Sequence, residues 1–134
     1  MGRRSTTTVL AAVLVLASLP APAQHGHPLV GTWSGDWGPT PEQRNRVLLL
    51  LEYDGEAVTG VINPGPDPVP LTSASLDPTT WTVVLRGVRP NPEGNEIEYV
   101  IEGQIENVTS PTQRTITGMW TQGGTQGDFR VTLN

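Results

Sequence analysis

Apolar and polar residues alternate with a period of two along most of the chain beyond residue 28, without the three-and-four spacing of a helix. The clearest alternation sets Ile97, Tyr99, Ile101 and Ile105 against glutamates and Gln104. Clusters of Gly, Pro, Asn and Asp separate these segments, as turns separate strands. The pattern predicts eight strands, at 29–37, 44–53, 56–63, 69–76, 80–87, 96–106, 113–121 and 128–133.

The order of these segments predicts an all-β fold, an antiparallel eight-stranded up-and-down meander. Asp54-Gly55 is typical of a tight hairpin between two of the strands. The run Val47–Leu51 is apolar at every position, which predicts a strand buried on both sides. Because an open meander would expose two edges, we expect the sheet to close, or nearly close, into a barrel.

Gly-x-Trp occurs twice, as Gly31-Thr32-Trp33 near the start of the predicted sheet and as Gly118-Met119-Trp120 near its end. Glycine inside a strand normally weakens a sheet. Here it can let the strand bend and let an indole ring lie flat on its neighbour. We expect the two indoles to fill the barrel where the first and last strands meet.

The first 23 residues form a separate unit. Arg3-Arg4, the apolar run Val9–Leu19 and the small residues Ala21-Pro22-Ala23 follow one another in the order of a cleaved secretory signal. The apolar run is shorter than the about 20 residues that span a bilayer. We predict a signal peptide at 1–23, a flexible N-terminus at 24–28 and a single barrel domain at 29–134, in a secreted or periplasmic protein.

Composition narrows the range of partners and chemistries. The chain has 13 acidic residues and eight basic ones, all arginine, and a formal net charge of −5. Binding to a phosphate backbone needs a basic patch, so we exclude nucleic acid and do not expect an anionic membrane surface as partner. Because cysteine is absent, thiolate metal sites and thiol catalysis are excluded. We predict no metal and no cofactor.

The two motifs resemble those of a small all-β domain that occurs alone or before the catalytic domain of secreted bacterial α/β-hydrolases. That domain opens with Gly-x-Trp-x-Gly, as Gly31–Gly35 does here, and ends with Ile-x-Gly-x-Trp-x-Gln-Gly-Gly, as 116–124 does. Val58-Thr59-Gly60 and Pro70-Leu71 match two further strands, whereas the loop 63–69 is shorter and richer in proline than the family's loop. The opening motif is more loosely similar to calycin barrels, the lipocalins and avidins. The resemblance implies a barrel with an accessory or binding role and no catalytic one.

Groups that could catalyse a reaction are scarce. The only histidines, His25 and His27, fall in or beside the expected flexible N-terminus, so a Ser or Thr nucleophile would lack a positioned base. Copper binding at His25-Gly26-His27 is a minor alternative. Paired carboxylates could hydrolyse a glycoside. The nearest candidates are rim residues, namely Asp36, Glu52, Asp54 and Glu56. We predict no catalytic residue, with a minor hydrolase that uses these carboxylates as the alternative.

The mouth of an eight-stranded barrel can hold one small molecule. The candidate lining residues are the aromatics and a rim arginine, namely Trp33, Trp37, Trp81, Tyr99, Trp120 and Arg46. Trp37 stands beside Gly38-Pro39 at a strand end, so we expect it to be the exposed aromatic and the main contact residue. The competing interpretation is that the aromatics only fill the core. We predict a non-catalytic binding or accessory barrel for a small apolar ligand or a partner surface, with a purely structural module as the alternative.

Overall fold

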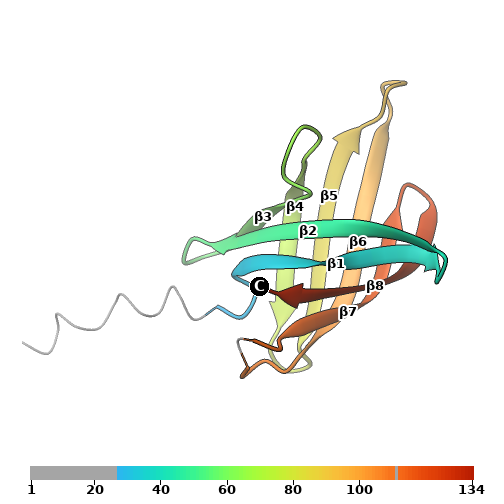
Figure 1. Cartoon of the computed structure of the whole chain (residues 1–134). Helices are drawn as coiled ribbons and strands as arrows, with labels where there is room; N and C mark the ends of the chain where they lie inside the picture. Colours follow the sequence, from blue (N-terminus) through green and yellow to red (C-terminus); the bar gives the residue numbers. More distant parts are fainter. Residues whose placement is uncertain (1–26, 111) are drawn as a thin grey trace, which may run out of the picture.

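The computed structural model describes residues 27–110 and 112–134, and its regular structure is entirely β-strand. The predicted signal peptide at 1–23 lies outside the described residues. The strands are β1 (Gly31–Thr40), β2 (Gln43–Tyr53), β3 (Val58–Ile62), β4 (Val69–Asp77), β5 (Thr82–Pro90), β6 (Glu96–Glu106), β7 (Thr115–Gln122) and β8 (Thr125–Leu133) (Figure 1). Within the described ranges, no helix is long and apolar enough to cross a membrane.

The eight strands form a closed barrel. Each strand pairs antiparallel with the next, and β8 returns to pair with β1 from Trp33↔Leu133 to Gly38↔Asp128. In Figure 1, β1, β2 and β8 cross in front of β4, β5 and β6. The predicted meander and its closure are confirmed.

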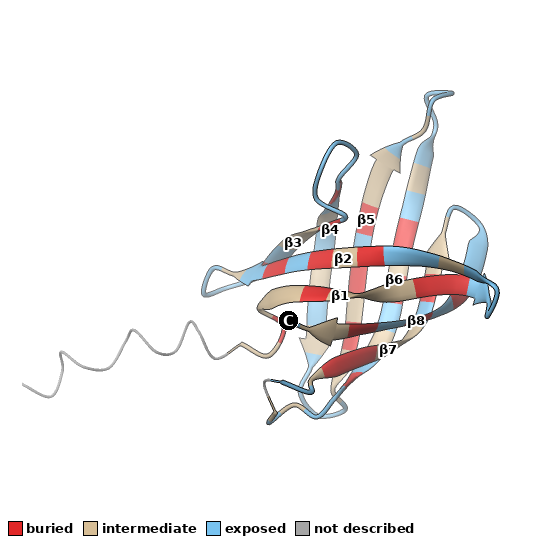
Figure 2. Ribbon diagram, in the orientation of Figure 1, coloured by how far each residue is buried: buried red, intermediate tan, exposed pale blue. Residues whose placement is uncertain are grey.

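Alternate residues of each strand fill the interior, which appears in Figure 2 as separated red bands along β2 and β5. On β2, Val47, Leu49 and Leu51 are buried, whereas Leu48 is half-buried and Leu50 is 38% exposed. The prediction that this strand is buried on both sides is therefore wrong. The outer face of a single-layer barrel has no second layer to cover it, so the additional leucines face solvent.

Glycines let two neighbouring strands approach closely. Gly103 of β6 lies opposite Gly118 of β7, and a Cβ on Gly118 would clash with the Glu102 carbonyl oxygen and the Gly103 Cα. A Cβ on Gly103 would lie 2.8 Å from Cζ of the Phe129 ring. Glycine does therefore make room for an aromatic ring, although at Gly103 the ring is a phenyl group and not an indole.

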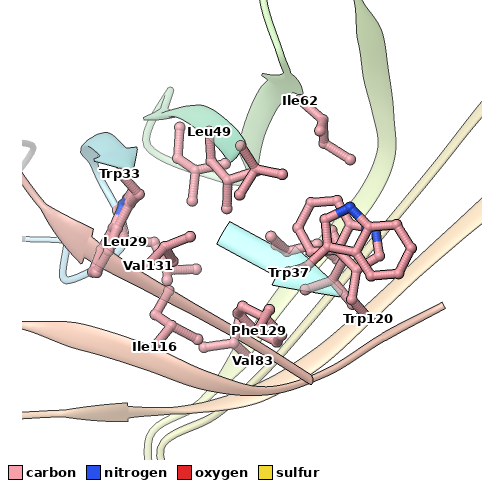
Figure 3. Close-up of a cluster of buried hydrophobic side chains, with 14 of the residues drawn as sticks. Leu29, Trp33, Trp37, Leu49, Ile62, Val83, Ile116, Trp120, Phe129 and Val131 are labelled. Atoms are coloured by element: carbon pink, nitrogen blue, oxygen red, sulfur yellow. The ribbon is translucent and has the colours of Figure 1, made fainter. Parts of the chain in front are cut away.

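The turns divide between two ends of the barrel. The terminal end carries residues 27–30, the C-terminus, the turns 54–57 and 78–81 and the connection from β6 to β7, and the loop end carries the turns 41–42, 63–68, 91–95 and 123–124. Trp33 lies near the start of β1 and Trp120 near the end of β7, two strands that run in the same direction, so these residues lie at opposite ends. Figure 3 shows them on opposite sides of the core. The expectation that both indoles fill the barrel where the first and last strands meet is therefore wrong.

The pairing between β3 and β4 is the shortest of the barrel. It consists of Val61↔Pro70 and Ile62↔Val69, and β3 has only 5 residues. Pro70 has no N–H to donate to the ladder. The barrel wall is therefore held least firmly beside the loop 63–68, at the loop end.

Candidate ligand-binding site

Two of the predicted lining residues, Trp33 and Trp81, lie at the terminal end. Trp33 is fully buried, and its indole Nε1 donates a 2.9 Å hydrogen bond to the Leu29 carbonyl oxygen. Arg114 donates to the carbonyl oxygens of Pro28 at 3.0 Å and of Val108 at 2.6 Å. Trp81 is half-buried in the turn before β5, with a φ of 60°. The chain itself therefore plugs this end, and Trp33 belongs to the core.

Trp37, expected to be exposed, is buried and only 6% accessible. Its ring stacks on that of Trp120, with ring centroids 5.7 Å apart and an interplanar angle of 10°. The Trp120 ring meets Phe129 edge-on at 5.9 Å. The expectation failed because β1 does not end at Trp37 but continues to Thr40, so Trp37 keeps the inward direction of Trp33. Trp37 and Trp120 form an aromatic pair that fills the core toward the loop end (Figure 3).

Arg46, the predicted rim arginine, lies on the outer surface. Its neighbour Val47 is buried in the core, so Arg46 projects outward and is exposed. Arg44 on the same face ties three strands together, because its guanidinium donates to Asp36 and Asp128, each at 2.7 Å. The hydrogen bonds to Asp128 and then Asp36 raise the pKa of Arg44, and the Arg44 hydrogen bond lowers the pKa of Asp128. A hollow of about 490 Å³ lies beside this triad. Arg44, Asp36 and Asp128 are engaged with one another, as a clasp across β1, β2 and β8, and Arg130 also lines this hollow.

A second hollow, of about 410 Å³, opens at the loop end. Its walls come from the loop 63–68 and the adjoining ends of β4, β5, β6 and β7. The lining residues are Asn63, Pro64, Pro66, Asp67, Val69, Arg89, Tyr99 and Gln122. Of the predicted site residues only Tyr99 is among them. The aromatic pair is joined to this wall, because Trp120 Nε1 donates a 3.1 Å hydrogen bond to Gln122 Oε1. We call this space the mouth hollow.

Two side-chain amides of the mouth hollow have their oxygens occupied. Gln122 Oε1 accepts from Trp120, and Asn63 Oδ1 accepts from the Leu48 N–H at 3.0 Å. Because both partners can only donate, the accepting atom of each amide must be oxygen. Neither amide NH2 group makes a hydrogen bond within the described part of the chain. Asn63 and Gln122 therefore offer donors to an occupant of the hollow.

Arg89 adds a cation to these donors. It continues the inward-facing series Val83, Leu85 and Gly87 at the end of β5. Its Nε is buried and has no hydrogen-bond partner among the described residues. The ion pairs found in that part of the chain involve Arg44, so no carboxylate neutralises Arg89, although Asp67 lines the same hollow. A buried donor without a partner destabilises a protein by about 1–3 kcal/mol. Because Nε is buried, an acceptor in the hollow could bond to it and recover that free energy only if the Arg89 side chain shifts.

Sequence reasoning missed Arg89, Asn63 and Gln122. For Arg89 and Gln122 a signal was present, because each is a polar residue that continues an inward series, after Leu85 and Gly87 on one strand and after Trp120 on the other. The predicted strands ended at 87 and 121, whereas β5 continues to Pro90 and β7 to Gln122. Asn63 gave no such signal, since it leaves the strand with a φ of 52°.

The rim carboxylates do not form a cluster. Asp36 lies near the loop end, whereas Glu52, Asp54 and Glu56 lie at the terminal end, about 20 Å away at the rise of a strand. Asp54 accepts from the backbone N–H groups of Ala57 and Glu56, at 2.9 and 2.8 Å, and these bonds lower its pKa. Asp54 therefore organises the turn between β2 and β3. Glycosidase carboxylates stand roughly 5–9.5 Å apart, so Asp36 does not form such a pair with any of the other three.

His27, expected to be flexible, makes specific contacts. Its Nδ1 accepts from the Leu29 N–H at 3.1 Å, and its ring lies 4.5 Å from that of Tyr53. Burial lowers the pKa of its imidazole. His25 and Gly26, the other residues of the candidate copper site, lie outside the described residues. Over 27–110 and 112–134, no group of three or more His, Cys, Asp or Glu could hold a metal ion. The glutamates of β6 face outward, as predicted.

Comparison with known proteins found no counterpart, since no family model, no curated protein and no solved structure matches the chain. The fold and the site therefore define the protein as a closed, antiparallel eight-stranded β-barrel with a donor-lined hollow at one end. The similarity to the small all-β domain of bacterial hydrolases stays a prediction that rests on the two motifs.

Proposed function

We propose that the protein is a non-catalytic binding barrel that takes one small molecule in the mouth hollow. The observation that carries this proposal is the meeting of Arg89 with the amides of Asn63 and Gln122, all with donor groups left over, in one hollow. Its volume of about 410 Å³ falls within the range of roughly 300–1,000 Å³ that small-molecule sites occupy. The predicted signal peptide supports a role outside the cytoplasm.

In this proposal the ligand binds at the mouth of the barrel and not deep inside it. Trp120 is fully buried and Trp37 nearly so, and they stack on each other where an interior ligand would lie. Tyr99 and Val69 line the mouth instead and give the ligand an apolar contact. This differs from the expected aromatic cage, because the tryptophans support the site without lining it.

Local contacts restrict the loop 63–68 at the mouth hollow, although the pairing of β3 with β4 beside it is short. Asn63 bonds to Leu48 in both directions, through its N–H at 2.7 Å and through its side-chain oxygen at 3.0 Å. Pro64, Pro66 and Pro68 fix φ at alternate positions of the adjoining loop. A site that is already ordered loses less entropy when a ligand binds. This geometry favours a binding role over hydrolysis, for which the separated carboxylates offer no support.

Ligand-observed NMR with a panel of small acids, amides, alcohols and sugars tests the proposal. We expect saturable binding by part of the panel, weakened in Gln122→Ala and unchanged in Gln126→Ala, an exposed glutamine on β8. Trp emission should change on binding, because the Trp120 indole is bonded to Gln122. If no compound binds, or if both variants bind as the parent does, the mouth hollow is not a ligand site and the barrel is a structural or interaction module.

A further inference from the structure

Arg89 is a cation without an ion pair in the part of this acidic protein that the structure describes. The chain has a formal net charge of −5, and the acidic residues of β6 beside it, Glu96 and Glu98, are on the outer face. The groups in the mouth hollow that can carry charge are Arg89, Asp67 and Tyr99. Asp67 stands beyond ion-pair distance, so Arg89 keeps its charge without a local partner. A ligand that supplies one negative charge would complete the site.

The shape and charge of the guanidinium narrow the chemistry further. A guanidinium can present its two Nη groups as a planar fork that matches the two oxygens of a carboxylate. A neutral ligand could accept a hydrogen bond from the guanidinium, but it would not compensate the charge. A phosphate or sulfate dianion would be repelled by Asp67 and by the acidic chain around it. A planar monoanion therefore fits best, with the amide NH2 groups of Asn63 and Gln122 as further donors.

Prolines provide the apolar part of the site. A smaller hollow of about 200 Å³ adjoins the first and shares Pro66, Asp67 and Arg89 with it, while Pro68 and Pro90 line its far side. Arg89 thus stands between two spaces that proline rings border. The mouth hollow has Val69 and Tyr99 on its inner wall. A compact ring or branched chain would contact these surfaces while its charged group reached Arg89.

From these observations we propose that the ligand is a small carboxylic acid with a compact apolar body, bound as the carboxylate by Arg89. This inference rests on the proposed function, because it names the class of ligand for the same hollow. Asn63 and Gln122 orient the carboxylate, and the prolines of the loop 63–68 contact its apolar part.

A comparison of benzoate with its neutral isostere benzamide separates the inferred preference for a carboxylate from the proposed binding function. Binding is measured by ligand-observed NMR to the full folded domain, to Arg89→Met and to the matched variant Arg86→Met, whose side chain is exposed on the outer face of the same strand. We expect benzoate to bind at least roughly tenfold more tightly than benzamide, and Arg89→Met to remove this preference, because a charged hydrogen-bonded partner is lost. Arg86→Met should retain it.

Gln122→Glu gives a second test that preserves the fold. Its carboxylate oxygen can still accept from the Trp120 indole, while the amide donor becomes a negative charge. We expect this variant to lose the binding of benzoate and to retain the binding of benzamide. The control is Gln126→Glu, which adds the same charge on β8 outside the hollow and should bind both compounds as the parent does. Circular dichroism confirms that each variant is folded.

Each outcome of these measurements decides the question. If benzoate and benzamide bind equally well and Arg89→Met does not change their affinity, the carboxylate inference is overturned. The proposed binding function then still stands. If Arg89→Met and Arg86→Met weaken benzoate binding equally, the protein attracts the anion by its general electrostatics. This result also overturns the inference. If no compound in the panel binds, the inference and the proposed function fall together.

Discussion

Replacing Trp33 by Phe tests the account of how the terminal end is sealed. Trp33 has no exposed surface, and its Nε1 is the donor to the Leu29 carbonyl oxygen at 2.9 Å. The smaller ring leaves a cavity that destabilises by about 1 kcal/mol. The carbonyl left without its donor adds about 1–3 kcal/mol. The sum, about 2–4 kcal/mol, is a large part of the roughly 5–15 kcal/mol that a domain of this kind possesses.

The matched control is Trp81→Phe, the same substitution at the same end of the barrel. Trp81 is half-buried, and no hydrogen bond of its indole N–H is found among the described residues. We expect this change to lower the free energy of unfolding by less than about 1 kcal/mol. Urea unfolding followed by circular dichroism measures both variants, and the melting temperature of Trp33→Phe should fall by roughly 10–25 °C. If the two substitutions destabilise equally, burial and the Leu29 bond do not explain the role of Trp33.

Four further measurements test other parts of the structure. Arg44→Met should lower the melting temperature modestly, and the difference from the parent should shrink in high salt, because its partners are exposed carboxylates. Asp54 has a folded pKa below its unfolded value, so its contribution to stability is present above about pH 4 and is lost as the pH falls through the folded pKa. Urea midpoints between about pH 2 and 5 should therefore vary less steeply in Asp54→Asn than in the parent, with exposed Glu93→Gln as the control. Amide hydrogen exchange should be faster in β3 and the start of β4 than in β5 and β6, and equal protection would contradict the weak seam. Arg89→Met should raise the unfolding free energy of the free protein by about 1 kcal/mol, and a loss of stability would show that Arg89 is structural.

The alternation of residue types predicted the eight strands, and the two exposed edges of an open meander predicted their closure. The alternation worked because in a barrel made of one layer each strand has one inner and one outer face, so the period of two is preserved along β6 and β8. The same reasoning was wrong for Leu48 and Leu50, because apolar character alone does not distinguish a strand covered on both sides from one with leucines on its outer surface. It was also wrong for Trp37, since Gly38-Pro39 reads as a strand end, yet β1 continues beyond it.

The candidate site was harder to predict than the fold, because it depends on where the strands end. Tyr99, one of the predicted lining residues, lies at the mouth hollow, and its inward direction follows from the alternation of β6. Arg89 lies beyond the point where β5 was expected to stop, next to Pro90, so its inward direction was not recognised. The role of Asn63 depends on a backbone turn and on the distant Leu48, a contact that the sequence of either segment does not reveal.

The two ends of the barrel treat their polar groups in opposite ways, and this contrast bears on function. At the terminal end the Trp33 indole and the Arg114 guanidinium satisfy carbonyl oxygens of the chain itself. At the loop end Arg89 and two amides keep donors without partners within residues 27–110 and 112–134, although an apolar residue at 89 would have continued the inward series Val83, Leu85 and Gly87. A sequence shaped for stability alone would place such a residue there, because a buried donor without an acceptor is unfavourable. The proposed function accounts for this departure from the barrel's own pattern, because in it an acceptor comes from outside the chain.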